Sequence, residues 1–201
     1  MKNKIGVLIP ARLESNRLPG KPLRELNGKS ILERTYNQVA KVVDKKHIYI
    51  LTDSKKILQN LQHKISNIIL TTGNYYSGTE RCARNFKKIK KNYSGYLIVS
   101  CDFPYISTNC IVETIKNFRK ISNKKEYVGS TIHTTSKDKK IIYSKKIPKI
   151  VLNNNNDIIY FSRSPIPSNY KLKVDYNVHH GIVCLKPQAF NLFINLKNNK
   201  L

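Results

Sequence analysis

The sequence lacks tryptophan, contains a single methionine, and has only 12 acidic residues against 37 lysines and arginines in a chain of 201 residues. It also lacks any apolar run of about 18 residues, the length that a membrane-spanning helix needs. The basic residues 1–4 precede a short apolar run without a small-residue cleavage site, which argues against a signal peptide. These absences predict a cytoplasmic protein with no membrane partner.

Cysteine is scarce and is not arranged for metal binding. None of the four cysteines belongs to a C-x-x-C pair, and no histidine stands at metal-ligating spacing from them. Three of them sit in apolar patterns. We therefore predict free, buried thiols in a reducing compartment. The four are Cys82, Cys101, Cys110 and Cys184.

The formal net charge of +25 raises nucleic-acid binding as one class of function. The excess is mostly lysine spread along the chain among asparagine and isoleucine, as AT-rich codon usage produces. Aromatic and basic residues are not interleaved as they are on a single-strand stacking surface. We therefore predict no nucleic-acid partner, and expect the charge to help capture small anionic substrates.

Strand and helix signals alternate through the first 120 residues. Buried strands are predicted at residues 5–9, 47–51, 68–70 and 96–99. Helices are predicted after a capping box of Ser30 and Glu33, after Ser54, over residues 79–91 and after a Thr108 cap. This order predicts an α/β, Rossmann-like fold with a mixed, mostly parallel sheet.

The second half changes to antiparallel signals. Residues 127–133 alternate like a strand, and the lysine-rich stretch 134–147 is predicted to be a mobile loop. Residues 149–152 and 158–163 flank an asparagine-rich turn and predict a hairpin. A strand at 181–185 and a helix from Pro187 through Leu196 follow. A single domain with a small antiparallel arm fits best.

Residues 9–23 read I-P-A-R-L-E-S-N-R-L-P-G-K-P-L and follow the first buried strand. Arg12, Arg17 and Lys21 fall within this stretch, with a Pro-Gly bend between them. The P-loop pattern and the dinucleotide pattern G-x-G-x-x-G are both absent. Cations and free backbone N–H groups at the carboxyl edge of a sheet suit phosphate groups, whereas the alternative is a merely solvated basic loop.

Asp102 directly follows the strand, taken here as residues 96–101, so its carboxylate should face the same edge. Carboxylate oxygens suit Mg²⁺, and the alternative is a turn or helix-cap aspartate. Ser77 and Gly78 open a helix whose first N–H groups are free for a ligand. Arg81 lies one turn further and presents a planar fork to a carboxylate or phosphate, unless it is only a surface residue behind a capping box.

Three motifs carry a family resemblance. R-x-x-S-x-R-L-P-G-K-P-L resembles the signature loop of sugar nucleotidyltransferases, in the form found in cytidylyltransferases that activate acidic sugars. S-G-T-E-R at 77–81 and Y-F-S-R at 160–163, followed by P-I-P, are similar to motifs of the 3-deoxy-manno-octulosonate cytidylyltransferase (CMP-Kdo synthetase) family. His179 matches the histidine of that family's H-x-G-I step. The resemblance runs from residue 5 to about residue 196.

The resemblance implies transfer of CMP from CTP to 3-deoxy-D-manno-octulosonate (Kdo), with Mg²⁺ and release of pyrophosphate, for lipopolysaccharide synthesis. Residues 1–125 would form the nucleotide-binding half of one domain, and 126–201 the half for sugar binding and homodimer formation. The expected catalytic residues are Arg12, Lys21 and Asp102, with Asp102 as the metal ligand. The expected nucleotide-binding residues are Ala11, Arg12, Ser15, Arg17, Lys21 and Ser77. The expected sugar-binding residues are Arg81, Arg163 and His179, although an arginine on a hairpin edge or a histidine before a strand is often structural.

The sequence also departs from the family. Relatives carry Q-G-D-E-P where this chain has Ser100-Cys101-Asp102-Phe103-Pro104, and they carry a further V-D-T-P-E-like metal aspartate that is absent before Leu201. Either the chain is truncated, or another chain or residue supplies that ligand. The alternatives are therefore a cytidylyltransferase for another acidic sugar (8-amino-Kdo or a nonulosonate) and a shortened, non-catalytic nucleotide-binding relative.

Overall fold

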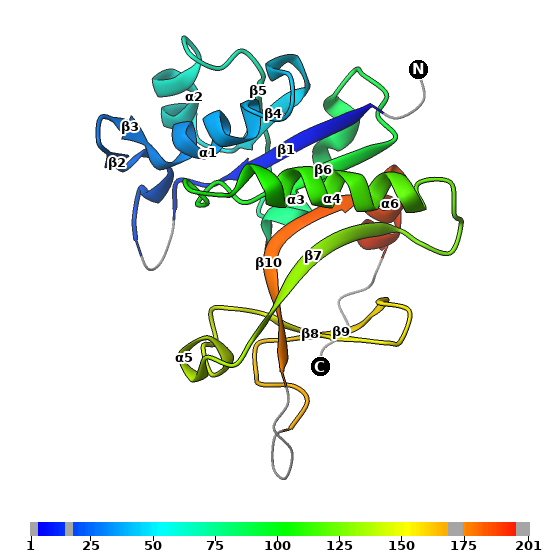
Figure 1. The fold of residues 1–201 in the computed structure, drawn as a ribbon. Coiled ribbons are helices and arrows are strands. Elements are labelled where there is room, and N and C mark those ends of the chain that lie inside the picture. Colours follow the sequence, from blue (N-terminus) through cyan, green and yellow to red (C-terminus); the bar gives the residue numbers. More distant parts are fainter. Residues whose placement is uncertain (1–3, 15–17, 169–174, 196–201) are drawn as a thin grey trace. The chain divides into compact units, whose positions relative to one another are not determined.

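The computed structural model describes residues 4–14, 18–168 and 175–195 (Figure 1). The chain forms two compact units, residues 1–130 with 183–201 and residues 131–182. The second unit is thus an insertion, after which the chain returns to the first. The predicted functional halves, 1–125 and 126–201, remain a prediction, because the structure divides the chain by compactness alone. In the described residues, no helix is long and apolar enough to cross a membrane.

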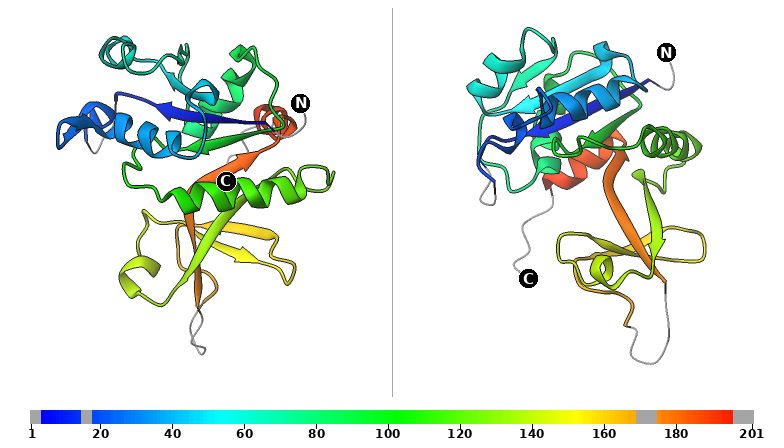
Figure 2. Two further views of the ribbon diagram at one scale, coloured as in Figure 1. Left: turned by 45° about the horizontal axis from the view of Figure 1, so that its top comes forward. Right: turned by 60° about the vertical axis from the view of Figure 1, so that its left-hand side comes forward.

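The first unit is built on parallel strands in the order β5-β4-β1-β6. These strands are β1 (Ile5–Ala11), β4 (Ile48–Thr52), β5 (Ile68–Leu70) and β6 (Gly95–Val99), with β10 (Tyr176–Leu185) beside β6. The connecting helices are α1 (Ile31–Ala40), α2 (Lys55–Leu61), α3 (Gly78–Asn85) and α4 (Thr108–Ile121), and α6 (Pro187–Asn195) follows β10 (Figure 2). The predicted α/β class is confirmed.

Apolar residues on both faces of these strands explain why they are central. On one face, Leu8 and Ile98 pack with Cys82 and Phe86 of α3 and with Phe190 of α6. Val7 and Ile9 alternate with Leu8 along β1 and are fully buried on the other face. Burial on both sides is typical of parallel strands. Such a sheet holds the loops at its carboxyl edge rigidly.

Short elements fill the remaining loops of the first unit. The strands β2 (Glu25–Leu26) and β3 (Lys29–Ser30) pair as a separate antiparallel ribbon. Single 3₁₀ turns are η1 (Lys21–Leu23), η2 (Lys45–His47) and η3 (Phe86–Lys88). In the described residues, all four cysteines are free thiols, as predicted, but only Cys82 and Cys184 are buried, whereas Cys101 and Cys110 are partly exposed.

The second unit contains the predicted hairpin, with β8 (Lys149–Leu152) antiparallel to β9 (Ile158–Ser162). The strand β8 also pairs antiparallel with β10, so β9 ends the described strand order. The remaining elements are β7 (Gly129–Ser136), which begins in the first unit and pairs with β10, and α5 (Lys139–Ile142).

Several predicted boundaries are wrong. The predicted helix over 79–91 is α3 followed by the tighter turn η3, and the cap of α4 is Ser107, whose Oγ accepts from the Asn109 amide at 3.2 Å. The stretch 134–147 is not a continuous loop, because β7 extends to Ser136 and Asp138 caps α5. By contrast, the caps at Ser30 and Ser54 are confirmed by hydrogen bonds to their side chains, although the Glu33 carboxylate accepts from Lys64 at 3.1 Å.

Candidate active site

The ends of β1 and β6 bring the first two predicted residues together. A left-handed turn at Gly20 (φ +69°) leads into η1, which begins at Lys21 and is anchored by buried Pro22. Because β1 and β6 are parallel neighbours, the residues that follow them meet at one sheet edge. Lys21 Nζ lies 2.5 Å from Asp102 Oδ2, and the Ser100 hydroxyl donates to Asp102 Oδ1 at 2.5 Å.

The surroundings of Asp102 keep it ionised. Partial burial alone would raise the pKa of its carboxyl, but the hydrogen bonds from Lys21 and Ser100 outweigh this and lower the pKa below its usual value. The neighbouring Cys101 responds oppositely: burial and the Asp102 charge raise the pKa of its thiol to about 12. The site therefore offers a carboxylate beside an ammonium, next to a protonated thiol.

The loop that carries Asp102, after β6, is also held by a contact with α1. Thr35 is fully buried on α1, and its hydroxyl reaches the Cys101 carbonyl oxygen at 3.1 Å. This contact holds the backbone next to Asp102 against α1. The helix that follows β1 and η1 thus supports the loop that follows β6.

The beginning of α3 lies against the end of β1. The Ser77 Oγ accepts from the Glu80 amide at 3.1 Å and caps the helix. A Cβ on Gly78 would come within 2.8 Å of Pro10 Cγ, so only glycine permits this approach without a shift. Pro10 precedes Ala11, so two of the predicted nucleotide-binding residues, Ala11 and Ser77, are next in sequence to this close approach of Gly78 to the Pro10 ring.

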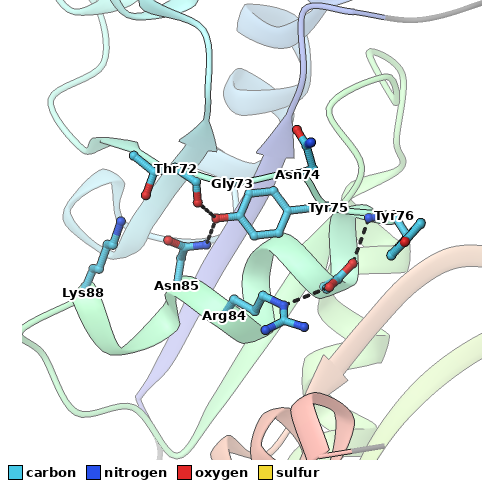
Figure 3. A pocket seen from close by; sticks show the side chains of 9 residues that line it. Thr72, Gly73, Asn74, Tyr75, Tyr76, Arg84, Asn85 and Lys88 are labelled. Atoms are coloured by element: carbon cyan, nitrogen blue, oxygen red, sulfur yellow. Dashed lines mark hydrogen bonds and ion pairs between the residues drawn. The ribbon is translucent and has the colours of Figure 1, made fainter. Parts of the chain in front are cut away.

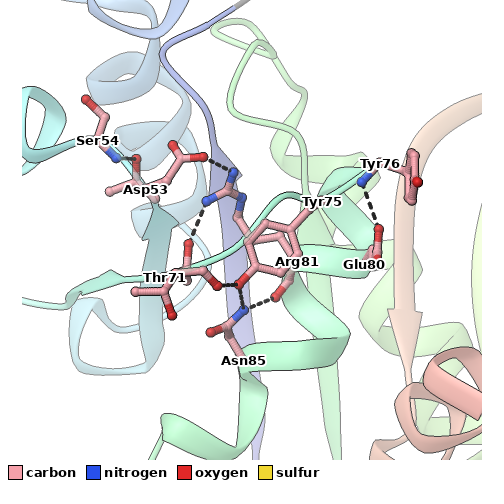
Figure 4. Close-up of polar contacts among 10 residues, drawn as sticks. Asp53, Ser54, Thr71, Tyr75, Tyr76, Glu80, Arg81 and Asn85 are labelled. Atoms are coloured by element: carbon pink, nitrogen blue, oxygen red, sulfur yellow. Dashed lines mark hydrogen bonds and ion pairs between the residues drawn. The ribbon is translucent and has the colours of Figure 1, made fainter.

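Arg81 is only 4% exposed and is engaged by protein groups. It donates to Asp53 Oδ2 at 2.5 Å and to Thr71 Oγ1 at 2.6 Å, and its Cζ lies 4.7 Å from the centre of the Tyr75 ring (Figure 4). The predicted sugar-binding role of Arg81 stays a prediction. The sequence analysis missed Thr71 and Tyr75; the signal for Asp53 was its place directly after β4, as Asp102 follows β6.

Arg163 and His179 belong to the second unit. Arg163 donates through one guanidinium nitrogen to the Lys145 carbonyl oxygen at 2.8 Å. The ammonium of Lys149, which is fully buried, donates to the carbonyl oxygens of Ser144, Ile147 and Arg163 at 2.8, 2.9 and 3.0 Å. Lys149 therefore holds the backbone of Arg163, and the carbonyl oxygen of Lys145 holds its side chain.

His179 has partners on both ring nitrogens. Its Nδ1 accepts from the Gly181 amide at 3.2 Å, and its Nε2 lies 2.9 Å from Thr131 Oγ1, whose proton goes to the Ile182 carbonyl oxygen. This pattern requires the proton on Nε2. Burial, with the nearby His180, lowers the pKa of His179 to about 4, so the ring is neutral at physiological pH. Its sugar-binding role also stays a prediction.

The remaining predicted residues differ in what can be said of them. Arg12 is exposed, and its charge acts on the Cys101 thiol, which places it at the same sheet edge. Ser15 and Arg17 lie outside the described residues. Among the residues that the structure describes, no group of three His, Cys, Asp or Glu side chains is placed to hold a metal. Asp102 alone still fits Mg²⁺, which proteins commonly bind through one or two carboxylates together with substrate phosphates.

A pocket of about 490 Å³ lies between α3 and the segment after β5 (Figure 3). Its lining is polar and aromatic, with the basic residues Arg84 and Lys88 on the helical side and in η3. Tyr75 crosses it, because the Asn85 amide donates to its hydroxyl at 2.9 Å and the hydroxyl donates to the Thr72 carbonyl oxygen. This pocket includes none of Ser77, Arg81 and Asp102 in its lining.

Known proteins with similar sequences define the class of this protein. The cytidylyltransferase family matches residues 6–195, and this chain belongs to that family. The 3-deoxy-manno-octulosonate cytidylyltransferase of Parabacteroides distasonis is 34% identical over 168 residues, which are 83% of this chain and 65% of that protein. The enzyme of the same name from Rickettsia prowazekii is 29% identical over 204 residues, covering all of this chain and 79% of the relative.

A solved structure supports the same relationship. The structure of CMP:2-keto-3-deoxy-manno-octonic acid synthetase complexed with CTP superposes with a TM-score of 0.87 at 26% identity, covering 98% of this chain and 80% of that chain. The chain thus spans 65% of the length of the Parabacteroides relative and about four fifths of the solved one. The predicted family is confirmed.

Proposed function

We propose that this chain transfers CMP from CTP to Kdo and releases pyrophosphate. The observation that carries the proposal is the Lys21–Asp102 pair at the carboxyl edge of the parallel sheet, where ligands of open α/β sheets bind. The relatives from Parabacteroides distasonis and Rickettsia prowazekii are both named 3-deoxy-manno-octulosonate cytidylyltransferase, which supports the choice of sugar. In this reaction the anomeric hydroxyl of the sugar forms a bond to the α-phosphorus of CTP as the α–β phosphoanhydride bond breaks, and the hydroxyl proton is lost.

Catalysis of this kind needs positioning and charge neutralisation, with no covalent enzyme intermediate. Arg12 and Lys21 would bind the triphosphate, together with Ser15 and Arg17 from the segment outside the described residues. Ala11 and Ser77 would lie against the nucleoside, since each is next in sequence to one partner of the close approach between Pro10 and Gly78. The ammonium of Lys21 is already directed at this edge by its hydrogen bond to Asp102.

Asp102 is the residue that would hold Mg²⁺, and the ion would supply positive charge to the phosphate oxygens. The lowered pKa of Asp102 keeps its carboxylate ionised at neutral pH, the state that binds a cation. Ser100, which donates to the other carboxylate oxygen, orients the group.

The sugar acid would be bound by Arg163 and His179, with Arg81 as a further candidate from the sequence. Arg163 carries the positive charge that a sugar carboxylate requires. His179 would act as a neutral hydrogen-bonding group, since its pKa is lowered to about 4. The proposed setting is cytoplasmic lipopolysaccharide synthesis.

We also propose that two copies pair through β9. This strand ends the described strand order and exposes four consecutive large apolar residues, Ile158, Ile159, Tyr160 and Phe161. An edge strand of this kind is a template for strand addition, and contiguous apolar surface marks an interaction site. A second copy of the same chain offers the matching edge.

A second candidate is a non-catalytic nucleotide-binding relative. Phe103 stands where relatives carry a glutamate, and Asp102 has no partner carboxylates forming a metal cluster within the described residues. A third is a cytidylyltransferase for 8-amino-Kdo or a nonulosonate, because the sugar-binding residues alone do not distinguish these acids.

One assay separates the candidates. Purified protein is incubated with CTP, Mg²⁺ and each sugar acid in turn, and pyrophosphate release is measured. Release that depends on Kdo supports the proposal, and release with another acid identifies the alternative substrate. CTP binding by calorimetry without any release identifies the non-catalytic relative.

A further inference from the structure

The guanidinium of Arg81 joins three segments that are far apart in the sequence. One nitrogen donates to Thr71, just after β5, and another to Asp53, just after β4 (Figure 4). Its flat face lies against the Tyr75 ring at 4.7 Å from Cζ to the ring centre. With only 4% of the residue exposed, this fork serves protein groups on its planar edges and on one face.

The Tyr75 side chain is in turn held at its far end. Its hydroxyl accepts from Asn85 Nδ2 at 2.9 Å and donates to the Thr72 carbonyl oxygen. Asn85 Nδ2 also donates to the Arg81 carbonyl oxygen at 2.9 Å, which fixes the amide on α3. Arg81 and Asn85, one turn apart on α3, therefore hold the face and the hydroxyl of one aromatic ring.

Residues 72–76 also border a pocket. The pocket of about 490 Å³ is lined by residues 72–76 on one side and by residues of α3 and η3 on the other (Figure 3). The next contact along the chain is the Tyr76 amide, which donates to Glu80 Oε2 at 2.8 Å. Beside this pocket, contacts with Arg81, Asn85 and Glu80 of α3 hold residues 75 and 76 in place.

We propose that Arg81 is a positioning residue for nucleotide binding and does not contact the sugar acid. By fixing residues 71–76 it sets the place of Ser77 and Gly78, which follow directly and lie against Pro10 beside Ala11. The inference rests on the proposed function, because it assumes that CTP binds where Ser77 and Ala11 meet. We call the Arg81–Asp53 ion pair, with its contacts to Thr71 and Tyr75, the Arg81 clamp; Asp53 is its anionic partner.

The test uses Arg81→Lys and Asp53→Asn, with Arg119→Lys as the control on an exposed position of α4. CTP affinity is measured by calorimetry without sugar acid, and KM is measured for both substrates well below the melting temperature. We expect each clamp variant to weaken CTP binding about tenfold, which corresponds to about 1.4 kcal/mol. The KM for the sugar acid should stay within about twofold of wild type. The double variant should bind CTP no worse than Arg81→Lys alone, because the one ion pair that Asp53→Asn weakens is already disrupted in Arg81→Lys.

A rise in the sugar-acid KM with unchanged CTP affinity would overturn the inference and return Arg81 to the sugar site. A lower melting temperature with both substrate constants unchanged would overturn it as well, since it would leave Arg81 a purely structural role. If the wild type neither binds CTP nor releases pyrophosphate, the proposed function fails instead. Amide hydrogen exchange then decides the clamp itself: protection of residues 71–78 should fall in Arg81→Lys and not in Arg119→Lys, and unchanged protection contradicts it.

Discussion

Lys21 donates a 2.5 Å hydrogen bond to Asp102, 81 residues further along the chain, across the ends of two adjacent parallel strands. A cation therefore already occupies the carboxylate proposed to bind Mg²⁺. In the proposed reaction, the phosphates of CTP would offer Lys21 a second anionic partner at the same edge. The pair is thus arranged so that the ammonium and a metal ion can share the charge of the carboxylate and the triphosphate.

Asp102→Asn should lower kcat for pyrophosphate release by about a hundredfold or more, the scale expected when one preorganised charged group is lost. The amide keeps the size of the side chain but cannot carry the negative charge that binds Mg²⁺. Asp44→Asn is the matched control, because Asp44 pairs with Lys46 near the surface, just before the amino end of β4. Equal activity of Asp102→Asn and wild type would contradict the assigned role.

Lys21→Met should raise the KM for CTP and lower kcat, because both the bound triphosphate and the transition state lose a positive charge. An effect of about tenfold or more on kcat/KM is expected for a charge-assisted contact. Lys46→Met, which removes the lysine of another surface ion pair, should stay close to wild type. Steady-state kinetics with varied CTP measures both constants, and an effect confined to the sugar-acid KM would argue against triphosphate binding.

His179 should make stability depend on pH. Its ordinary pKa is 6.5 and its pKa in the fold is about 4, so between these values the unfolded chain binds a proton that the folded chain does not. Stability from this group is therefore complete above pH 6.5 and falls as the pH drops towards 4. Urea unfolding at several pH values gives the free energy of unfolding, which should change less with pH in this range for His179→Gln than for wild type. The exposed His63→Gln provides the control, and an unchanged slope in His179→Gln would count against the buried neutral ring.

Tyr160→Asp should shift the protein from dimer to monomer in light scattering after size exclusion. A charge at the centre of β9 would face the same charge of the second copy, and the exposed apolar strip would be interrupted. Tyr143→Asp, on an exposed tyrosine of the same unit, should leave the mass unchanged. A wild-type mass of one chain at micromolar concentration would remove the proposed interface.

Gly95→Ala should destabilise the protein by about 1–3 kcal/mol, the usual cost of overpacking a core. The added Cβ would lie 2.3 Å from Phe118 Cζ, which α4 packs directly over this strand. Combining it with Phe118→Leu should cost less than the sum of the two single changes, because the smaller side chain leaves room. Thermal or urea unfolding of the four proteins measures this coupling, and strict additivity would mean that the two residues are not in contact.

The parallel core and the meeting of Lys21 with Asp102 could be predicted from sequence, because both residues follow apolar strands and carboxyl ends of parallel strands share an edge. The burial of Arg81 could not. Its spacing within S-G-T-E-R places it one turn into a helix, but its partners Asp53 and Thr71 come from two other strand ends. Likewise, the end of α3 and the cap at Ser107 depended on local hydrogen bonds that neighbouring Thr108 offered equally well in the sequence.

The strands that lead into and out of the second unit are adjacent. At the boundary, a Cβ on Gly129 would come within 2.5 Å of the Cys184 carbonyl oxygen, and within the unit Thr131 Oγ1 donates to the Ile182 carbonyl oxygen at 2.5 Å. Residues 131–182 therefore form a cassette with neighbouring entry and exit points. Insertions, deletions or exchange of such a cassette can therefore be accommodated while the parallel sheet that carries Lys21 and Asp102 is left unchanged.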